Sequence, residues 1–376
     1  MNKVFILSQV AARWLVRPIM IFIAVLFAAP TFANTVTANC ADPTTDLQAL
    51  INSATTGEVI LISGTCVGQF QVPTQNITLQ GVGRRATLDG NRQGTVLTIG
   101  SPFMKGATLT ISRLVIRNGT DGIVNSGTTI LTHSKVIDNQ QAISNFFGDM
   151  TIEMSHIDRN GGGVDNDLSS TMTITDSKVT ANGDVGVRSN QASAEIKRSL
   201  ISGNYSSGMV VEQSSVTVTD SKIADNVCTN GCSGAGVFLR DGGSLNLVDS
   251  VVVGNNNGNN GEDGGGILTA PLANNLIVTN STISDNSTGG SGGGIYLYGG
   301  SLTLDRSRIA HNSAGIKGGG LFINSFFTGP AAFTDTDSIT QNRAGQDGGG
   351  VCKESSAVTV PSSIVTDNSP DDFCTR

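Results

Sequence analysis

Ser281-Thr-Ile-Ser-Asp-Asn286 and, after a glycine-rich turn, Gly292-Gly-Gly-Ile295-Tyr-Leu-Tyr298 form one copy of a pattern that recurs along most of the chain. An Asn stands at the same place in all eleven copies, and Val or Ile lies three residues before each one. The spacing is 21 or 22 residues at first and 26 to 31 residues later, which indicates an internal repeat. The aligned residues are Asn118, Asn139, Asn160, Asn182, Asn204, Asn226, Asn255, Asn286, Asn312, Asn342 and Asn368.

Each copy contains short stretches in which apolar and polar residues alternate, such as Leu302-Thr-Leu304 and Ile295-Tyr-Leu297. This period of two predicts β-strands. One copy has too few apolar residues for a core, but stacked copies place each inward Ile or Val about 4.8 Å from its equivalent. The pattern therefore predicts an all-β, single-domain parallel solenoid of about 13 coils in which the stack itself is the core.

Two residue types are expected at the corners of each coil. Asn suits one corner because it tolerates left-handed backbone angles and because its amide can hydrogen-bond to the next Asn in a ladder. Glycine suits the other corner, where positive φ or close backbone approach is needed. The glycine groups are Gly161–Gly163, Gly264–Gly266, Gly292–Gly294, Gly318–Gly320 and Gly348–Gly350.

Residues 1–33 are predicted to be a signal peptide. Lys3, Arg13 and Arg17 precede an apolar run over residues 19–29, and Thr31-Phe-Ala33 has small residues where cleavage would occur. The alternative is a transmembrane anchor, for which this run is short. We therefore expect a secreted, periplasmic or cell-surface protein with no stable membrane insertion after cleavage.

The chain is acidic, with a formal net charge of −7, and loss of the three positive charges in residues 1–33 brings it to about −10. Such a charge makes nucleic acid an unfavourable partner. Thr45 can cap a short helix whose Leu47, Leu50 and Ile51 share one face and cover the open end of the stack. We thus predict an N-terminal cap with a short helix over 34–57, the β-helix over 58–368 and a C-terminal cap over 369–376.

The six Cys residues allow fifteen pairings, but in an exported chain three local pairs are favoured: Cys40–Cys66, Cys228–Cys232 and Cys352–Cys374. None of the three His residues lies near a Cys pair, so we predict no metal site and no cofactor. Calcium is the alternative, at the Asn- and Gly-rich loop from Asn255 to Asp263, although this loop lacks the alternating ligand order of a calcium loop.

The entry to the repeats resembles a known superfamily. Leu47-Gln-Ala-Leu-Ile51, Gly64-Thr-Cys66, Ile77-Thr-Leu-Gln-Gly81 and Thr87-Leu-Asp-Gly90 look like the start of right-handed parallel β-helices of the pectin-lyase-like superfamily. Downstream, Gly-Gly-Gly-[Ile/Leu/Val] with [Ile/Val]-x-x-Asn is similar to the repeats of bacterial polymorphic outer-membrane proteins, with Ile or Val in place of Phe. The resemblance covers roughly residues 40–376 and implies a right-handed parallel β-helix without assigning an activity.

Alternation in the strand after the glycine corner predicts a ribbon of outward side chains along the stack, formed by Phe238, Leu268, Tyr296 and Phe322 and, two residues further on, Arg240, Ala270, Tyr298 and Asn324. Exposed apolar stripes on proteins are contact surfaces. Phe238, Arg240, Tyr296, Tyr298, Phe322 and Asn324 are the predicted binding residues, for a polysaccharide or a surface protein. The alternative is that loops cover the ribbon, or that it is a ladder that stabilises the stack.

A second column lies four residues before the Asn and contains Lys135, His156, Lys178, Lys222 and Arg308, with Asp138 and Asp158 nearby. A polysaccharide lyase needs a base and a cation beside the substrate carboxylate, and Lys135, His156, Lys178, Asp138 and Asp158 are candidates for these roles. The alternative is a solvated charge ladder. The Gly-His-Gly and Arg-Ile-Lys motifs of polygalacturonases are absent, and the only Asp-Asp lies at 371–372. We predict an exported, non-catalytic glycan- or surface-binding protein, with a lyase or hydrolase of acidic polysaccharides as the alternative.

Overall fold

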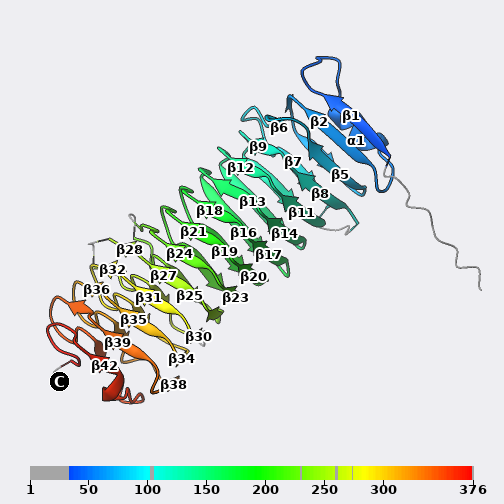
Figure 1. Ribbon diagram of the computed structural model, residues 1–376. Helices are drawn as coiled ribbons and strands as arrows, with labels where there is room; N and C mark the ends of the chain where they lie inside the picture. The colour runs from blue at the N-terminus through cyan, green and yellow to red at the C-terminus, as the bar shows by residue number, and fades with distance from the viewer. Residues whose placement is uncertain (1–33, 102–105, 229–230, 259–260, 273, 375–376) are drawn as a thin grey trace, which may run out of the picture. The chain divides into compact units, whose positions relative to one another are not determined.

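Each coil between the two end segments contributes one strand to each of three parallel sheets, and neighbouring coils follow one another in chain order (Figure 1). The computed structural model describes residues 34–101, 106–228, 231–258, 261–272 and 274–374. The predicted signal peptide lies outside the described residues. The predicted all-β parallel solenoid of about 13 coils is confirmed, because two of the sheets contain 13 strands and the third contains 12.

Sheet A is the first of the three and pairs its strands in register over up to five residues. Its strands are β1 (Thr35–Asn39), β2 (Val59–Ser63), β5 (Asn76–Gly81), β8 (Thr108–Ser112), β11 (Thr128–Thr132), β14 (Asp149–Glu153), β17 (Thr171–Thr175), β20 (Ser193–Lys197), β23 (Ser215–Thr219), β26 (Ser244–Val248), β30 (Asn275–Thr279), β34 (Ser301–Asp305) and β38 (Ala331–Ala332).

Sheet B follows sheet A in each coil and is built from shorter strands. They are β3 (Thr65–Val67), β6 (Thr87–Asp89), β9 (Val115–Arg117), β12 (Lys135–Ile137), β15 (His156–Asp158), β18 (Lys178–Thr180), β21 (Leu200–Ser202), β24 (Lys222–Ala224), β27 (Val251–Val253), β31 (Thr282–Ser284), β35 (Arg308–Ala310), β39 (Ser338–Thr340) and β42 (Val365–Thr366), with the 3₁₀ turn η1 (Ser362–Ile364) before the last.

Sheet C completes each coil. Its strands are β4 (Phe70–Val72), β7 (Leu97–Ile99), β10 (Asp121–Asn125), β13 (Gln141–Phe146), β16 (Gly162–Asp167), β19 (Val187–Asn190), β22 (Met209–Glu212), β25 (Val237–Arg240), β29 (Ile267–Thr269), β33 (Ile295–Leu297), β37 (Leu321–Ile323) and β41 (Val351–Lys353). Four later coils are longer and add a short fourth sheet between sheets B and C, made of β28 (Asn256–Asn257), β32 (Ser287–Thr288), β36 (Ser313–Ala314) and β40 (Arg343–Ala344).

The core consists of columns of aliphatic side chains that follow from the period of two. In sheet A, Leu131 pairs with Ile111 on one side and Ile152 on the other, and all three are fully buried. Burial of a side chain of this size stabilises the fold by about 1.5–3 kcal/mol. Because each coil repeats the contact, the stack supplies the apolar burial that a single coil lacks.

The predicted Asn ladder is confirmed from Asn139 onward. The backbone N and the Nδ2 of each Asn both donate to the Oδ1 of the next, at 3.1 and 3.0 Å for Asn182 and Asn204. The predicted left-handed backbone at these residues is wrong, since the preceding residue carries the positive φ, for example 54° at Asp225. At the C-terminal end, Asp372 accepts hydrogen bonds from the N and Nδ2 of Asn368 and terminates the ladder.

Asn118 is not a member of the ladder. Arg117 pairs with Ile137, so Asn118 occupies the place of Asp138 and has the same φ of 58°. The ladder position in that coil is Gly119, whose N donates to the Oδ1 of Asn139 at 2.8 Å. The alignment on Asn is therefore wrong by one residue in the first of the eleven copies, the one that contains Asn118.

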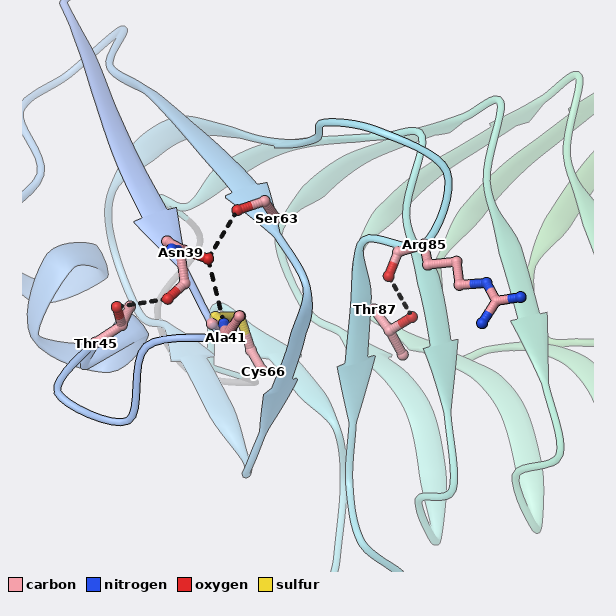
Figure 2. Close-up of a disulfide and its surroundings, with 8 residues drawn as sticks. Asn39, Ala41, Thr45, Ser63, Cys66, Arg85 and Thr87 are labelled. Carbon is pink, nitrogen blue, oxygen red and sulfur yellow. Dashed lines mark hydrogen bonds between the residues drawn. A yellow bond between two sulfur atoms is a disulfide. The ribbon is translucent and has the colours of Figure 1, made fainter.

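The N-terminal end of the stack is covered by α1 (Leu47–Ser53), with Leu47 and Ile51 buried. Asp46 is the N-cap, not Thr45 as predicted, because the Asp46 Oδ1 accepts from Ala49 N at 2.9 Å. Thr45 instead donates to the Asn39 carbonyl, as Figure 2 shows. Gln48 exchanges hydrogen bonds with the backbone of Gln71, which satisfies peptide groups of the terminal strand β4.

All three predicted disulfides are confirmed, and no Cys is free. The Cys40–Cys66 bond joins the segment after β1 to β3 (Figure 2). The Cys352–Cys374 bond joins β41 to the C-terminal segment, where Phe373 packs against the core. Disulfides of this number are typical of proteins that fold in an oxidising compartment.

Candidate functional site

The predicted ribbon on sheet C is in register. Phe238 pairs with Leu268, Leu268 with Tyr296, Tyr296 with Phe322, and Phe322 with Cys352. The Tyr296 and Phe322 rings stack with centroids 4.9 Å apart. The stacking that the sequence predicts is thus confirmed.

The predicted exposure of this ribbon is wrong. Tyr296 is 6% exposed and Phe322 is 4% exposed, and with Leu268 and Cys352 they form a second apolar cluster outside the main core. The positive φ of Gly292 and Gly318 explains why the ribbon is buried. At each glycine the loop that precedes the strand of sheet C turns back over the ribbon. A Cβ on Gly292 would lie 2.7 Å from the Tyr296 Cβ, so only glycine allows this close approach.

The Tyr296 hydroxyl is held within this cluster. It accepts a hydrogen bond from the Asn324 Nδ2 at 2.8 Å. Burial, together with the nearby Asp263 carboxylate, raises the Tyr296 pKa to about 12. Burial likewise raises the pKa of Asp263, which accepts from Ser291 N at 2.7 Å. Tyr296 is therefore engaged inside the cluster, Asn324 lies half-buried beside it, and a role for either in binding stays a prediction.

Arg240 and Phe238 lie at the less covered end of the ribbon and are half-buried. The Arg240 guanidinium forms an ion pair with Glu212, with its Nε at 2.9 Å from the carboxylate, and lies 5.8 Å from the centre of the Phe238 ring. Its charge is therefore already compensated by a neighbouring coil. Of the predicted binding residues, only Tyr298 contacts a strongly exposed aromatic ring, that of Phe326.

Tyr298 stacks on Phe326, with centroids 5.5 Å apart and ring planes at 12°. Phe326 is 68% exposed, and Leu272 across the groove is 64% exposed. A groove of about 520 Å³ runs between them and is lined also by Asn275 and Ser301. We call Phe326, Leu272, Asn275 and Ser301, together with Tyr298, which stacks on Phe326 without lining the groove itself, the aromatic groove.

Sequence reasoning missed Phe326 and Leu272 because both lie in loops outside the repeat. Phe326 is held outward by its own backbone, whose N donates to the Asn324 Oδ1 at 2.9 Å, while the adjacent Phe327 is fully buried. The signal that was available is an aromatic residue in a polar turn, since Phe326 directly follows Asn324-Ser325 outside the repeat. The aromatic residues predicted for binding and those that are exposed are thus largely different.

The second predicted column is in register on sheet B. Lys135 pairs with His156, His156 with Lys178, Lys178 with Leu200, and Leu200 with Lys222. The four basic side chains are exposed. Partial burial, then the charges of Lys178 and Lys135, lower the His156 pKa, so the ring is neutral at pH 7.

The two predicted catalytic carboxylates are engaged in ion pairs. Arg159 lies 3.6 Å from Asp138 and also contacts Asp158, which in addition accepts from the Thr180 hydroxyl at 2.9 Å. The structure thus brings Lys135, His156 and Lys178 together, but it directs both carboxylates towards Arg159. A role for these five residues in cleavage remains a prediction.

An acidic cluster on sheet C was missed by sequence reasoning. Burial raises the Asp165 pKa to about 6, against the opposing effect of Arg188, whose Nε lies 3.7 Å from it. The buried Arg188 Nε has no hydrogen-bond partner within the described part of the chain. Nearby, the Ser144 hydroxyl donates to Asp121 at 3.0 Å. The signal available was Asp165 at an outward position two residues after the glycine corner 161–163.

Within the described ranges, no group of three or more His, Cys, Asp or Glu side chains can hold a metal ion. The loop predicted as the alternative calcium site includes residues 259–260, which lie outside these ranges. Calcium binding therefore stays a prediction. No helix over the described residues is long and apolar enough to cross a bilayer.

Comparison with known proteins bears on the fold. Residues 103–249 match the family model of the right handed beta helix region. No curated protein sequence matches the chain.

Three solved structures illustrate the likeness. Pectate lyase Pel9A is 15% identical, with a TM-score of 0.33, and the match covers 83% of this chain and 69% of the lyase. Tailspike protein 2 of Escherichia coli O157:H7 bacteriophage CAB120 is 11% identical, with a TM-score of 0.44, and the match covers 83% of this chain and 43% of the tailspike. DFA-IIIase of Arthrobacter chlorophenolicus A6 without its lid is 12% identical, with a TM-score of 0.46, and the match covers 87% of this chain and 97% of the DFA-IIIase.

At these identities the likeness concerns the fold alone. The continuous strand order of the three sheets extends the matched coils on both sides. The chain is therefore a right-handed parallel β-helix, with residues 103–249 matching the family of that name.

Proposed function

We propose that this protein is an exported β-helix that binds a glycan through the aromatic groove and does not itself cleave it. The observation that carries the proposal is the stacked pair Tyr298–Phe326, with Phe326 68% exposed beside a groove of about 520 Å³. Three disulfides, which are typical of proteins in oxidising compartments, support export.

The chemistry of the groove suits a sugar ring. Flat aromatic faces pack against the C–H face of a sugar, and the amide and hydroxyl of Asn275 and Ser301 can bind its hydroxyl groups. Ser301 already donates to the Asn275 Oδ1 at 2.7 Å, so the two polar groups are held in place before a ligand arrives. Such preorganisation reduces the entropy lost on binding.

The test compares Tyr298→Ala and Phe326→Ala with a matched control. Tyr205 is 60% exposed, belongs to another coil and contacts no other aromatic ring among the described residues, so Tyr205→Ala removes an equally exposed ring. On a glycan array and by calorimetry, we expect each groove variant to lose about tenfold or more in affinity, corresponding to 1.4 kcal/mol per stacked ring.

Tyr205→Ala should bind like the parent, and Phe326→Ala should keep the parent melting temperature because the ring is exposed. Retained glycan binding by the double variant Tyr298→Ala/Phe326→Ala would refute the aromatic groove as the site. Loss of binding in Tyr205→Ala to the same extent would show that the effect is not local.

Polysaccharide cleavage is the second candidate, favoured by Asp165 rather than by the basic column. A carboxyl group with a pKa near 6 can donate a proton to a leaving oxygen near neutral pH, and Arg188 can neutralise an acidic substrate group. The assay follows absorbance of unsaturated ends and release of reducing ends from pectate, alginate and glycosaminoglycans, with and without calcium. Activity that Asp165→Asn abolishes would support cleavage, whereas no product in either assay would defeat it.

A further inference from the structure

The basic column on sheet B differs from the other charged contacts between neighbouring coils. Among the described residues, six ion pairs join a basic and an acidic side chain on adjacent coils: Arg117–Asp89, Arg159–Asp138, Arg188–Asp165, Arg198–Asp176, Arg240–Glu212 and Lys317–Glu354. By contrast, the ammonium groups of Lys135, Lys178 and Lys222 form no ion pair or hydrogen bond with any described residue. Like charges in one column repel one another, so stability does not account for this arrangement.

The spacing of the three lysines is regular. Lys135, Lys178 and Lys222 lie on every second coil, with His156 and Leu200 on the coils between them. At about 4.8 Å per coil, neighbouring ammonium groups are separated by about 9.6 Å along the stack. Because His156 is neutral at pH 7, the positive charge recurs on every second coil and not on every coil.

The surface between Lys178 and Lys222 is a shallow, partly apolar groove that does not reach Lys135. A groove of about 600 Å³ contains Lys178, Leu200, Lys222 and Val251. Along one side of the same groove lie Asp220 and Asp249, together with Asp176, whose charge is neutralised by Arg198 at 2.8 Å. The carboxylates of Asp220 and Asp249 therefore repel an anionic group that binds on their side of the groove instead of at the lysines.

We infer that the column Lys135–Lys178–Lys222 binds an extended anionic polysaccharide in which every second sugar carries the charge. Two sugar rings of an extended chain span about two coils of the stack, so each anionic group meets one ammonium group. The uncharged ring between two anionic groups then lies over Leu200, which offers an apolar surface and no charge. A polymer with a carboxylate on every sugar would place each alternate carboxylate over Leu200, where the column has no ammonium group and the nearby Arg198 is already paired with Asp176.

The inference goes beyond the proposed function and uses a different surface, since the aromatic groove is built from coils that begin after residue 254. The two can therefore fail separately. Phe326→Ala tests the aromatic groove, whereas the substitutions of Lys178, Leu200 and Lys222 below change only sheet B.

The test measures fluorescence anisotropy of two labelled oligosaccharides with equal numbers of carboxylates. One alternates uronate with an N-acetylated neutral sugar, and the other is an oligogalacturonate. We expect the parent protein to bind the alternating oligosaccharide more tightly, and Lys178→Gln and Lys222→Gln each to weaken it about 2- to 5-fold. The control is Lys197→Gln in β20, which removes one positive charge from sheet A, where Lys197 is paired with Glu195, and should leave affinity unchanged.

Leu200→Lys provides a test of the spacing itself. The new ammonium group fills the uncharged position and places positive charge on three successive coils, so affinity for oligogalacturonate should rise by at least about 3-fold relative to the alternating oligosaccharide. Raising the salt concentration should weaken binding of both. A sulfated alternating oligosaccharide that binds as the uronate does would support recognition of the charge interval.

Three results would overturn the inference. They are tighter binding of oligogalacturonate by the parent protein, equal loss of affinity in Lys197→Gln, and equal or tighter binding of a DNA duplex of matched charge. Failure of Leu200→Lys to change the preference would refute the role of the two-coil interval.

Discussion

Substitution of Asn204 by Ala is expected to be among the most destabilising single changes in the chain. Asn204 is fully buried in the middle of the ladder. Its Oδ1 accepts from the N and Nδ2 of Asn182 at 3.1 and 3.0 Å, and its Nδ2 donates to the Asn226 Oδ1 at 2.9 Å and to the Val179 carbonyl at 3.3 Å.

The magnitude follows from the groups that lose a partner. Asn204→Ala leaves the N and Nδ2 of Asn182 without this acceptor in a site closed to water. A buried donor without a partner costs about 1–3 kcal/mol, so two such donors predict a loss of about 2–6 kcal/mol. Asn226 keeps one donor to its Oδ1, because the backbone N of residue 204 remains, and contributes little.

Urea unfolding followed by circular dichroism measures the loss, and hydrogen exchange at the amide of Asn182 locates it. Stacked coils can unfold in parts. The two free energies are therefore comparable only if the unfolding free energy of the variant depends on urea concentration with the same slope as that of the parent. Tyr205→Ala in the same coil is the control and should cost less than about 0.5 kcal/mol because the side chain is exposed. A loss below about 1 kcal/mol for Asn204→Ala, with unchanged exchange at Asn182, would refute the reasoning.

Three further outcomes are expected. Tyr296→Ala should lower the free energy of unfolding by about 3–5 kcal/mol, and Tyr296→Phe by about 1 kcal/mol, because one removes a buried ring and the other only its hydrogen bond to Asn324; equal losses in urea unfolding would contradict this. The raised Asp165 pKa means that the folded state holds this proton more tightly than the unfolded state, so stability falls as pH rises from about 4 to about 6 and is level above. The free energy of unfolding falls by at most about 3 kcal/mol, and solvent reduces this value because the Asp165 side chain is 32% exposed. Asp165→Asn should abolish this component of the pH profile. Removing the Cys352–Cys374 bond, which closes 22 residues, should cost about 3 kcal/mol, and a melting temperature insensitive to Cys352→Ser/Cys374→Ser would exclude it.

The exposed side of each coil is where sequence and structure agree least. Tyr296 and Phe322 alternate with inward residues and therefore lie on the outer face of sheet C, yet both are buried. Alternation tells which face of a strand a side chain occupies, but not whether a loop from the same coil returns over that face. Here the return depends on the positive φ of Gly292 and Gly318, and on where the lengthened turns come to lie.

Local pattern was sufficient for the architecture. The Val or Ile three residues before each Asn from Asn139 onward, the Asn ladder and the three disulfides could all be inferred from the chain, because each depends on contacts within a coil or between neighbouring coils. Such contacts repeat, so one correct pairing predicts the rest. The exposed Phe326 and the high pKa of Asp165 are different, because they arise from loop conformation and burial that occur once in the chain. Features without a repeat leave no periodic signal, and only the folded arrangement of the loops reveals them.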